Sequence, residues 1–283
     1  MTNKIIVQGE PQIVSDIRNL ILDTFKDLVF IEEGHKYFLG GQELPSVSAV
    51  THQFKPEFDS ETIAKKYAKK HGETPEYWLD QWKFKNLIST TRGTLIHSWA
   101  ENYAYVKMGH PELITEDCKS KYYKEKNWLI PTRPKEEAIL KFYNELSPNF
   151  WIVMPETRVF SCIGSLKGKL KQDYCGCFDL LMYYLNPKNP RDPNNGLWVF
   201  DWKNNGSLFS DYNRQHNKNC LAPFNDLPDD SFSMYELQLS CYQMPLEAIG
   251  LKIVDRRIIW LKETGEYKLF ATRNLTDRLK STL

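Results

Sequence analysis

The chain has 283 residues, and its 37 basic and 36 acidic side chains leave a formal net charge of +1. This balance excludes a general attraction to nucleic acid, so any such binding must come from local basic patches. Hydrophobic residues make up 41% of the chain, which is enough for the core of a globular protein. No stretch approaches the roughly 20 apolar residues of a membrane span. The polar N-terminus carries no signal-peptide core, so we expect a cytoplasmic protein without a membrane partner, with its six scattered cysteines reduced.

The first 44 residues predict a helix followed by a hairpin. Apolar residues recur at helical spacing over residues 11–26. Two apolar runs, 28–31 and 36–39, flank a turn in which Gly34 is expected to take a left-handed backbone conformation. We assign residues 1–44 to an N-terminal helix and hairpin, and residues 45–283 to one larger domain.

A helical region follows, and then the pattern changes to that of strands. Ser46 is a plausible N-cap, and Pro245 is expected to end or kink a later helix. Helices are predicted over residues 59–71, 74–88, 90–108, 135–146 and 233–244. Strands are predicted over residues 151–160, 174–185, 197–202, 256–261 and 267–271. This order predicts an α/β or α+β domain with a helical N-terminal region.

The strand that ends in Asp201 and Lys203 is the most informative segment. The two residues lie two positions apart after an apolar run, so they share one face of the strand. Burying both charges is costly unless each has a partner or a function. One interpretation is a structural ion pair. The other is an Asp that holds a divalent metal and a Lys that positions a water, as in phosphodiester hydrolysis.

Other polar residues stand in patterns that could complete such a site. Asp179 lies within an apolar strand, close to Gly176, and needs a partner. His97 and Glu101 are four positions apart on a predicted helix and share a face. Glu156 could be a further metal ligand, or it could pair with Arg158 on its own strand face.

Four short motifs in this order resemble the PD-(D/E)XK nuclease superfamily. They are G-x-x-x-H at residues 93–97, G-x-x-D at 176–179, D-x-K at 201–203 and Q-x-x-x-Y at 238–242. The chain is most similar to the RecB-like exonuclease branch, which includes mitochondrial genome maintenance exonucleases and phage relatives. The resemblance covers roughly residues 45–261. It implies a restriction-endonuclease-like fold, with a central mixed sheet flanked by helices.

The resemblance also implies a metal site. His97, Asp179 and Asp201 would bind Mg²⁺ or Mn²⁺, with the backbone carbonyl of Trp202 as a further ligand. Glu156 matches an acidic position found in part of the superfamily. Two carboxylates and one imidazole suit a cation that retains part of its water shell. The chain lacks the late group of three cysteines found in iron–sulfur members, so no iron–sulfur cluster is expected.

The remaining motif residues would act on the substrate. Lys203 would orient or deprotonate the attacking water and stabilise the charged transition state. Gln238 and Tyr242, four positions apart on a helix, would hold the nucleic acid or shape the catalytic site. The expected activity is metal-dependent exonuclease cleavage of single-stranded DNA or DNA ends in recombination, repair or phage replication. A bacterial cell or a phage-infected host would be the setting, with a recombinase, helicase or single-strand-binding protein as a partner.

Local basic segments are the candidate contacts to the DNA backbone. Lys65, Lys66 and Lys69 alternate with an aromatic residue, as in single-strand binders, and Tyr212 and Arg214 lie in a long loop after the D-x-K strand. Similar basic stretches occur at residues 121–126 and 167–171. Two alternatives stay open: a catalytically silent nucleic-acid-binding module with a nuclease-like fold, and a small-molecule hydrolase in which Asp201 and Lys203 are a structural pair.

Overall fold

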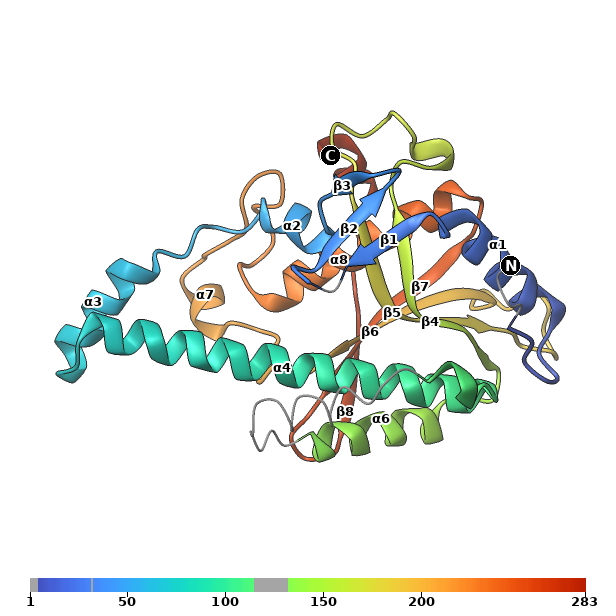
Figure 1. Ribbon diagram of the computed structural model, residues 1–283, viewed down its shortest axis with the longest axis horizontal. Coiled ribbons are helices and arrows are strands. Elements are labelled where there is room, and N and C mark those ends of the chain that lie inside the picture. The colour runs from blue at the N-terminus through green and yellow to red at the C-terminus, as the bar shows by residue number, and fades with distance from the viewer. Residues whose placement is uncertain (1–4, 32, 115–131) are drawn as a thin grey trace.

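The computed structural model describes residues 5–31, 33–114 and 132–283. Within these residues, a sheet in the order β4-β5-β6-β7-β8 forms the centre of the molecule (Figure 1). β6 and β7 run parallel, and the other neighbours run antiparallel. The strands are β4 (Phe150–Phe160), β5 (Cys175–Tyr184), β6 (Gly196–Lys203), β7 (Ile253–Leu261) and β8 (Tyr267–Ala271). The predicted mixed α/β architecture is therefore confirmed.

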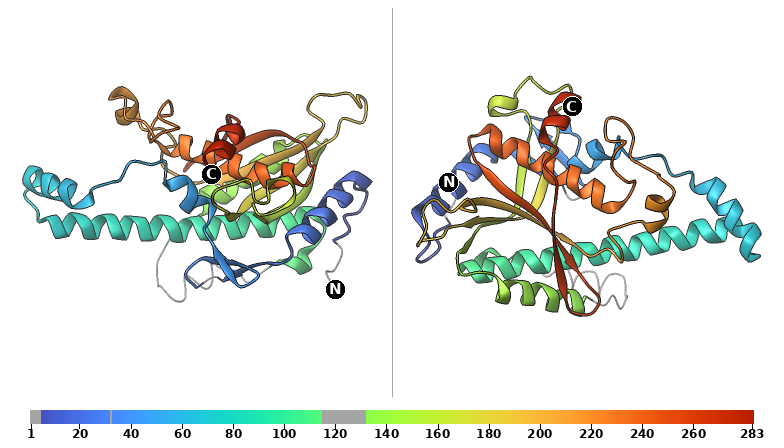
Figure 2. Two further views of the ribbon diagram at one scale, coloured as in Figure 1. Left: turned by 90° about the horizontal axis from the view of Figure 1, so that it is seen from above. Right: turned by 180° about the vertical axis from the view of Figure 1, so that it is seen from behind.

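Helices cover both faces of this sheet, and a smaller sheet lies at its side. The helices are α1 (Gln12–Phe25), α2 (Val47–His52), α3 (Ser60–His71), α4 (Pro75–Met108), α6 (Arg133–Glu145), α7 (Asp211–Gln215), α8 (Ser231–Ala248) and α9 (Thr276–Thr282). The small sheet consists of β1 (Leu28–Ile31), β2 (Lys36–Leu39) and β3 (Gln42–Leu44). Figure 2 shows α3 and the first half of α4 projecting from the body as a helical arm. No helix among the described residues is long and apolar enough to cross a membrane.

The two faces of the sheet bury separate apolar clusters. On β6, Val199 lies in the cluster shared with α1 and α8, whereas Phe200 and Trp202 lie in the cluster shared with α4 and α6. Because side chains alternate along a strand, Asp201 points to the α8 face. The core beneath α8 therefore receives a carboxylate at the end of an otherwise apolar strand.

The N-terminal helix packs into the same core as the large sheet. Phe25 contacts Phe160 of β4, with the ring centroids 5.1 Å apart. Arg18 is fully buried, and its guanidinium donates to the carbonyl of Val153 at 2.7 Å and to both oxygens of Glu10. Val153 is the bulged residue where the pairing of β4 with β5 shifts, so Arg18 satisfies backbone that the ladder leaves free. The domain division at residue 44 stays a prediction.

The helical arm differs from the sequence prediction, because α4 runs unbroken where we expected two helices. Near the expected break, the hydroxyl of Thr90 donates to the carbonyls of Asn86 and Leu87 at 3.0 and 3.1 Å. These bonds give the Thr90 hydroxyl partners within the helix, so α4 can continue through this residue. The short helix α9 and strand β3 were not predicted.

Of the two outcomes expected at Pro245, an end or a kink, the end is ruled out, since α8 continues to Ala248. Proline cannot donate to the carbonyl of Cys241. That carbonyl instead accepts a hydrogen bond from the Tyr174 hydroxyl at 2.8 Å. A tertiary contact thus replaces the missing helical bond. The helix ends at Ala248, and Gly250, two residues later, has a left-handed φ of 88° that turns the chain away from the helix.

Replacing Tyr174 with Phe should destabilise the protein by about 1–3 kcal/mol, because the buried carbonyl of Cys241 then has no donor. Urea unfolding followed by circular dichroism measures this change. In the double variant Tyr174→Phe/Pro245→Ala, the new amide at position 245 can donate to that carbonyl, so part of the loss should return. Equal stability of the single and double variants would contradict the exchange of donors.

Candidate metal and nucleic-acid site

The candidate site lies where the two central strands stop pairing. The last paired residues of β5 and β6 are Leu180 and Phe200, although β6 continues beside β7 to Lys203. Just beyond that point, an oxygen of the buried Asp179 carboxylate accepts the backbone N–H of Trp202 at 2.7 Å. The side chain therefore replaces a backbone acceptor. It joins the strands while the backbones separate and leave room for a polar site.

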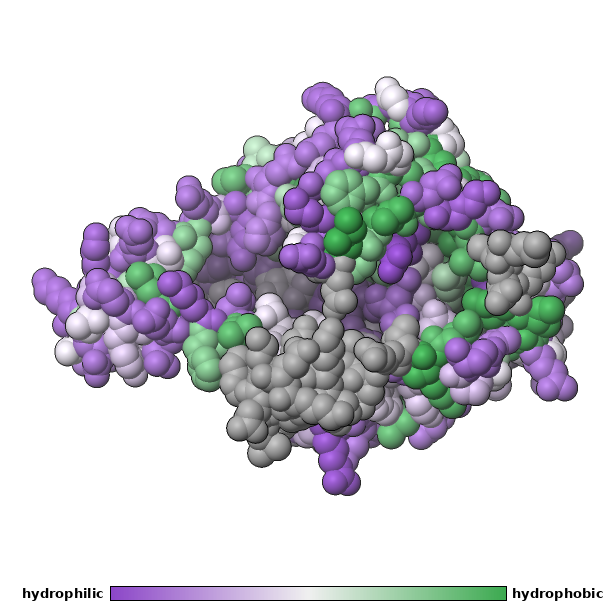
Figure 3. Space-filling model, in the orientation of Figure 1, coloured by the Kyte–Doolittle hydropathy of each residue, from purple (hydrophilic) through white to green (hydrophobic). Residues whose placement is uncertain are grey.

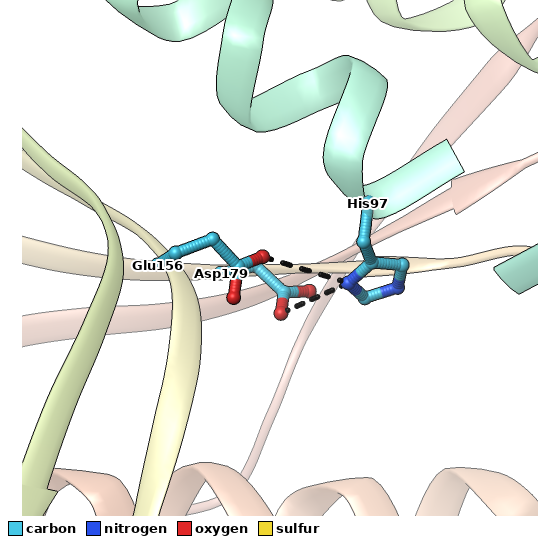
Figure 4. Close-up of side chains that lie close together, drawn as sticks. All are labelled: His97, Glu156 and Asp179. Carbon is cyan, nitrogen blue, oxygen red and sulfur yellow. Dashed lines mark ion pairs between the residues drawn. The ribbon is translucent and has the colours of Figure 1, made fainter. Parts of the chain in front are cut away.

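Three potential metal ligands converge beside this junction, each from a different element (Figure 4). His97 comes from α4, Glu156 from β4 and Asp179 from β5. The Nδ1 atom of His97 lies 3.2 Å from an oxygen of Asp179 and 3.8 Å from an oxygen of Glu156. One ligand atom from each residue lies within 4.8 Å of the others. This group, here called the His97 cluster, brings together three of the residues proposed from the sequence.

Glu156 reaches the cluster through an unusual backbone conformation. Its φ is 40°, and its neighbours Pro155 and Thr157 pair with Leu180 and Phe178 of β5. A left-handed residue that is not glycine is costly, at about 1–3 kcal/mol, and is held by its surroundings. The Cys177 thiol donates to Glu156 at 3.4 Å. Within the described part of the chain no ion pair joins Glu156 to Arg158, so the arrangement favours the ligand interpretation of Glu156.

Asp201 and Lys203 lie side by side, as predicted, and form a direct ion pair. Asp201 is 1% exposed, and the Lys203 ammonium lies 4.3 Å from the ring centroid of Tyr235 on α8. Burial and the nearby Asp179 raise the pKa of Asp201 to about 7, against the opposing effect of Lys203. Burial lowers the pKa of Lys203, but Asp201 and Asp179 outweigh it and keep the amine protonated. Among the described residues, Asp201 does not belong to the His97 cluster.

The electrostatics of the cluster suit a cation. Burial opposes protonation of His97, but Asp179 and Glu156 outweigh it and hold its pKa well above the usual value. Burial likewise would raise the pKa of Asp179, but His97 and Lys203 bring it below the usual value. Burial raises the pKa of Glu101, one helical turn from His97, to about 7. The imidazole thus offsets part of the negative charge of Asp179 and Glu156, and donors of these types are also ones that bind a divalent cation.

Gln238 and Tyr242 of α8 also lie at the site. They line the same cavity as the His97 cluster, which has a volume of about 880 Å³. The Gln238 amide donates to the Tyr242 hydroxyl at 2.9 Å, and the Tyr242 side chain is buried. Tyr242 lies so close to Gly176 that a Cβ there would come within 2.7 Å of its ring. The missing side chain at Gly176 makes room for the side chains of Tyr242 and Val47.

The proposed nucleic-acid contacts lie on separate parts of the structure. Lys65, Lys66 and Lys69 are exposed on α3 of the helical arm. Tyr212 is 59% exposed on α7. Arg214 is ion-paired at 2.7 Å with Asp230, which caps α8, so it also has a structural role. The basic stretch at residues 121–126 lies outside the described residues.

Tyr235 is the site residue that sequence reasoning missed. It lies three positions before Gln238 and seven before Tyr242, a spacing that places all three on one face of a helix.

Comparison with known proteins gives no family assignment, since no protein-family model matches the chain and no curated protein is significantly similar to it. The geometry and the sequence motifs therefore carry the functional argument.

Two glycines of the site should respond oppositely to substitution by alanine. Gly176→Ala should lower the free energy of unfolding by about 1–3 kcal/mol, because the new methyl group overlaps Tyr242 and Val47. Gly93→Ala should raise it by up to about 1 kcal/mol, since that Cβ meets only Asn204 at 3.6 Å and helix propensity improves. Urea denaturation of both variants measures the difference. If Gly176→Ala were as stable as the wild type, the Tyr242 ring would have to be able to move away from the new methyl group.

Proposed function

We propose that this chain is a nuclease that hydrolyses DNA phosphodiester bonds with Mg²⁺ or Mn²⁺, acting on single strands or DNA ends. We further propose that its fold is that of the PD-(D/E)XK superfamily, RecB-like branch. The observation that carries the proposal is the convergence of His97, Glu156 and Asp179 within 4.8 Å. They meet beside a D-x-K strand whose Asp201 and Lys203 are both held at the end of the sheet.

The order of the elements supports the same conclusion. The helix with His97 precedes β5 with Asp179, the D-x-K strand β6 follows, and α8 with Gln238 then crosses to β7. β6 and β7 are parallel neighbours, as expected for a strand–helix–strand crossover. The four motifs therefore lie, in chain order, on α4, β5, β6 and α8.

Each residue has a role that follows from its position. His97, Glu156 and Asp179 would hold the metal, and Asp201 and the Trp202 carbonyl, on the neighbouring strand, would be further ligands. When bound, the metal would supply positive charge for the phosphate and a water of lowered pKa. Lys203 supplies a compact positive charge for the scissile phosphate and orients the attacking water.

Two contacts hold the Lys203 ammonium in the place proposed for it beside the scissile phosphate. Asp201 pairs with it, and the ring of Tyr235 lies against it. Gln238 and Tyr242 form the opposite wall of the cavity and act on the substrate or shape the site. The exposed lysines of α3, with Tyr212 and Arg214, guide the strand towards it. A recombinase, helicase or single-strand-binding protein that delivers unpaired DNA is the proposed partner.

Removing the charges of the D-x-K strand should abolish cleavage. Asp201→Ala and Lys203→Met should each lower the cleavage rate by roughly 100-fold or more, because the first removes a proposed metal ligand and the second removes the positive charge beside the scissile phosphate. The assay incubates end-labelled single-stranded, duplex and circular DNA with Mg²⁺ or Mn²⁺ and reads the product ladder. Asp277→Ala, which changes an exposed carboxylate on α9, is the matched control and should retain full activity.

Full activity in Asp201→Ala would refute the proposal. Resistance of circular substrates would establish that the enzyme needs ends, whereas their cleavage would replace exonuclease by endonuclease action. Gel-shift binding of DNA by the wild-type protein with no cleavage under either metal would favour the catalytically silent binding module. Thermal unfolding of each variant separates loss of chemistry from loss of fold, since Asp201→Ala leaves a largely buried ammonium unpaired.

The metal itself should be detectable through stability. Mn²⁺ should raise the unfolding temperature of the wild-type protein, because a ligand that binds only the folded state stabilises it. Asp179→Asn should abolish most of that rise, since it removes a charged ligand from the His97 cluster. Differential scanning calorimetry with and without Mn²⁺ measures both. An equal rise in the variant would place the binding site elsewhere.

A further inference from the structure

The cavity extends well past the His97 cluster. Beyond it, one wall is α4, which presents Glu101 and Tyr105 at one and two helical turns from His97. The opposite wall comes from the β1–β2 hairpin, which contributes Phe30, His35 and Tyr37. The catalytic roles proposed above use none of these hairpin residues. In Figure 3 apolar side chains gather over the hairpin, and Val29 and Ile31 there are 55% and 44% exposed.

Arg158 brings a positive charge to this part of the cavity, which Lys26 also lines. It is exposed on β4, two residues after Glu156, and lines the same cavity. Within the described part of the chain, no carboxylate lies within ion-pairing distance of its guanidinium. Burial raises the pKa of Tyr105 to about 12, and Arg158 opposes that effect, so the two side chains are electrostatic neighbours. An unpaired guanidinium beside a metal-ligand cluster is suited to bind a phosphate.

One aromatic ring lies against this guanidinium, because its central carbon is 5.3 Å from the ring centroid of Phe30. Phe30 in turn contacts His35 and Tyr37, with centroids 4.9 and 4.8 Å apart. The His35 side chain is exposed and offers its ring to a flat ligand. Unpaired nucleotides are recognised through such a combination of guanidinium and stacked rings.

We propose that the space between the β1–β2 hairpin and α4 is a subsite for one nucleotide of an unpaired DNA strand. Arg158 binds the phosphate next to the scissile one, and the base stacks against the Phe30 and His35 rings. This inference rests on the proposed nuclease function and deepens it, because it names the substrate as a strand with an unstacked base. A base between hairpin and helix has left its own stack, which is least costly for a single strand or a frayed end.

The β1–β2 hairpin is held beside the large sheet through the helix that precedes it. The Phe25–Phe160 contact and the buried Arg18 fix α1 against β4, and β1 follows α1 after two residues. The subsite is thus bounded by Phe30, His35 and Tyr37 of the hairpin, by α4, and by Arg158 of β4. The N-terminal segment then serves as a substrate-binding wall of the catalytic cavity.

The test measures DNA binding apart from cleavage. Fluorescence anisotropy of a dye-labelled dT10 strand, in Ca²⁺ and in EDTA, compares wild type with Arg158→Ala and Phe30→Ala. Each variant should bind dT10 roughly 5- to 150-fold more weakly, the loss expected for one stacked base. Binding of a closed DNA hairpin should change much less. Arg158→Lys keeps the charge but not the planar stacking, so it should fall between Arg158→Ala and wild type.

Arg257→Ala is the matched control, because that guanidinium also lies over an aromatic ring, 5.6 Å from the centroid of Trp198, outside the cavity. It should bind dT10 as the wild type does. Wild-type affinity in Arg158→Ala, or an equal loss in Arg257→Ala, would overturn the subsite. If Arg158→Ala lost as much affinity for the closed DNA hairpin as for dT10, that result would also overturn the subsite. If wild type binds dT10 through Arg158 but cuts no DNA, the proposed function fails and the subsite stands.

Discussion

The site depends on one hydrogen bond, from the Trp202 amide to the Asp179 carboxylate. It lies where β5 and β6 stop exchanging backbone bonds, and it allows the strands to separate without leaving a buried donor unsatisfied. The same carboxylate pairs with His97 through its other oxygen. Asp179 therefore fixes the sheet and the cluster at once, and a metal ligand at this position is oriented by the backbone of the strand that carries Asp201 and Lys203.

The helix α8 supports this junction from the other face. It must lie close to the sheet, because Tyr242 occupies the space that a side chain at position 176 would need. Pro245 interrupts its hydrogen bonding, and the Tyr174 hydroxyl compensates from the residue just before β5. The strand that carries Asp179 is thus joined to α8 by one polar contact and by close packing. Gln238 and Tyr242 are positioned relative to the cluster by interactions that are not catalytic themselves.

Local periodicity predicted much of this structure, and tertiary contacts account for the rest. The shared face of Asp201 and Lys203 followed from the two-residue repeat of a strand, and most helix and strand positions followed from apolar spacing. The donor that supports α8 at Pro245 could not be predicted, because Tyr174 lies 67 residues from Cys241 in the sequence. The left-handed backbone of Glu156 likewise has no local sequence pattern, since glycine usually takes such positions. Nuclease function stays a prediction from four motifs.

In the His97 cluster, the imidazole that is held protonated offsets part of the charge of Asp179 and Glu156, whereas Lys203 pairs with Asp201. Cations of the protein itself thus already face both groups of carboxylates. Under the proposed function, a divalent cation would take the place of the imidazole proton, and its charge would weaken the hold of Asp201 on Lys203. The ammonium would then be available to a phosphate.

Metal and substrate binding are therefore expected to be coupled through the Asp201–Lys203 pair. A carboxylate that interacts with a cation loses part of its attraction for a second one, because the two cations repel each other. A phosphate that arrives with the metal supplies the negative charge that Lys203 gives up. The sequence left two interpretations of Asp201 and Lys203 open, a structural ion pair and a pair of catalytic groups. Under the proposed function both would hold: the residues form an ion pair without ligands, and they would act separately when metal and DNA are bound.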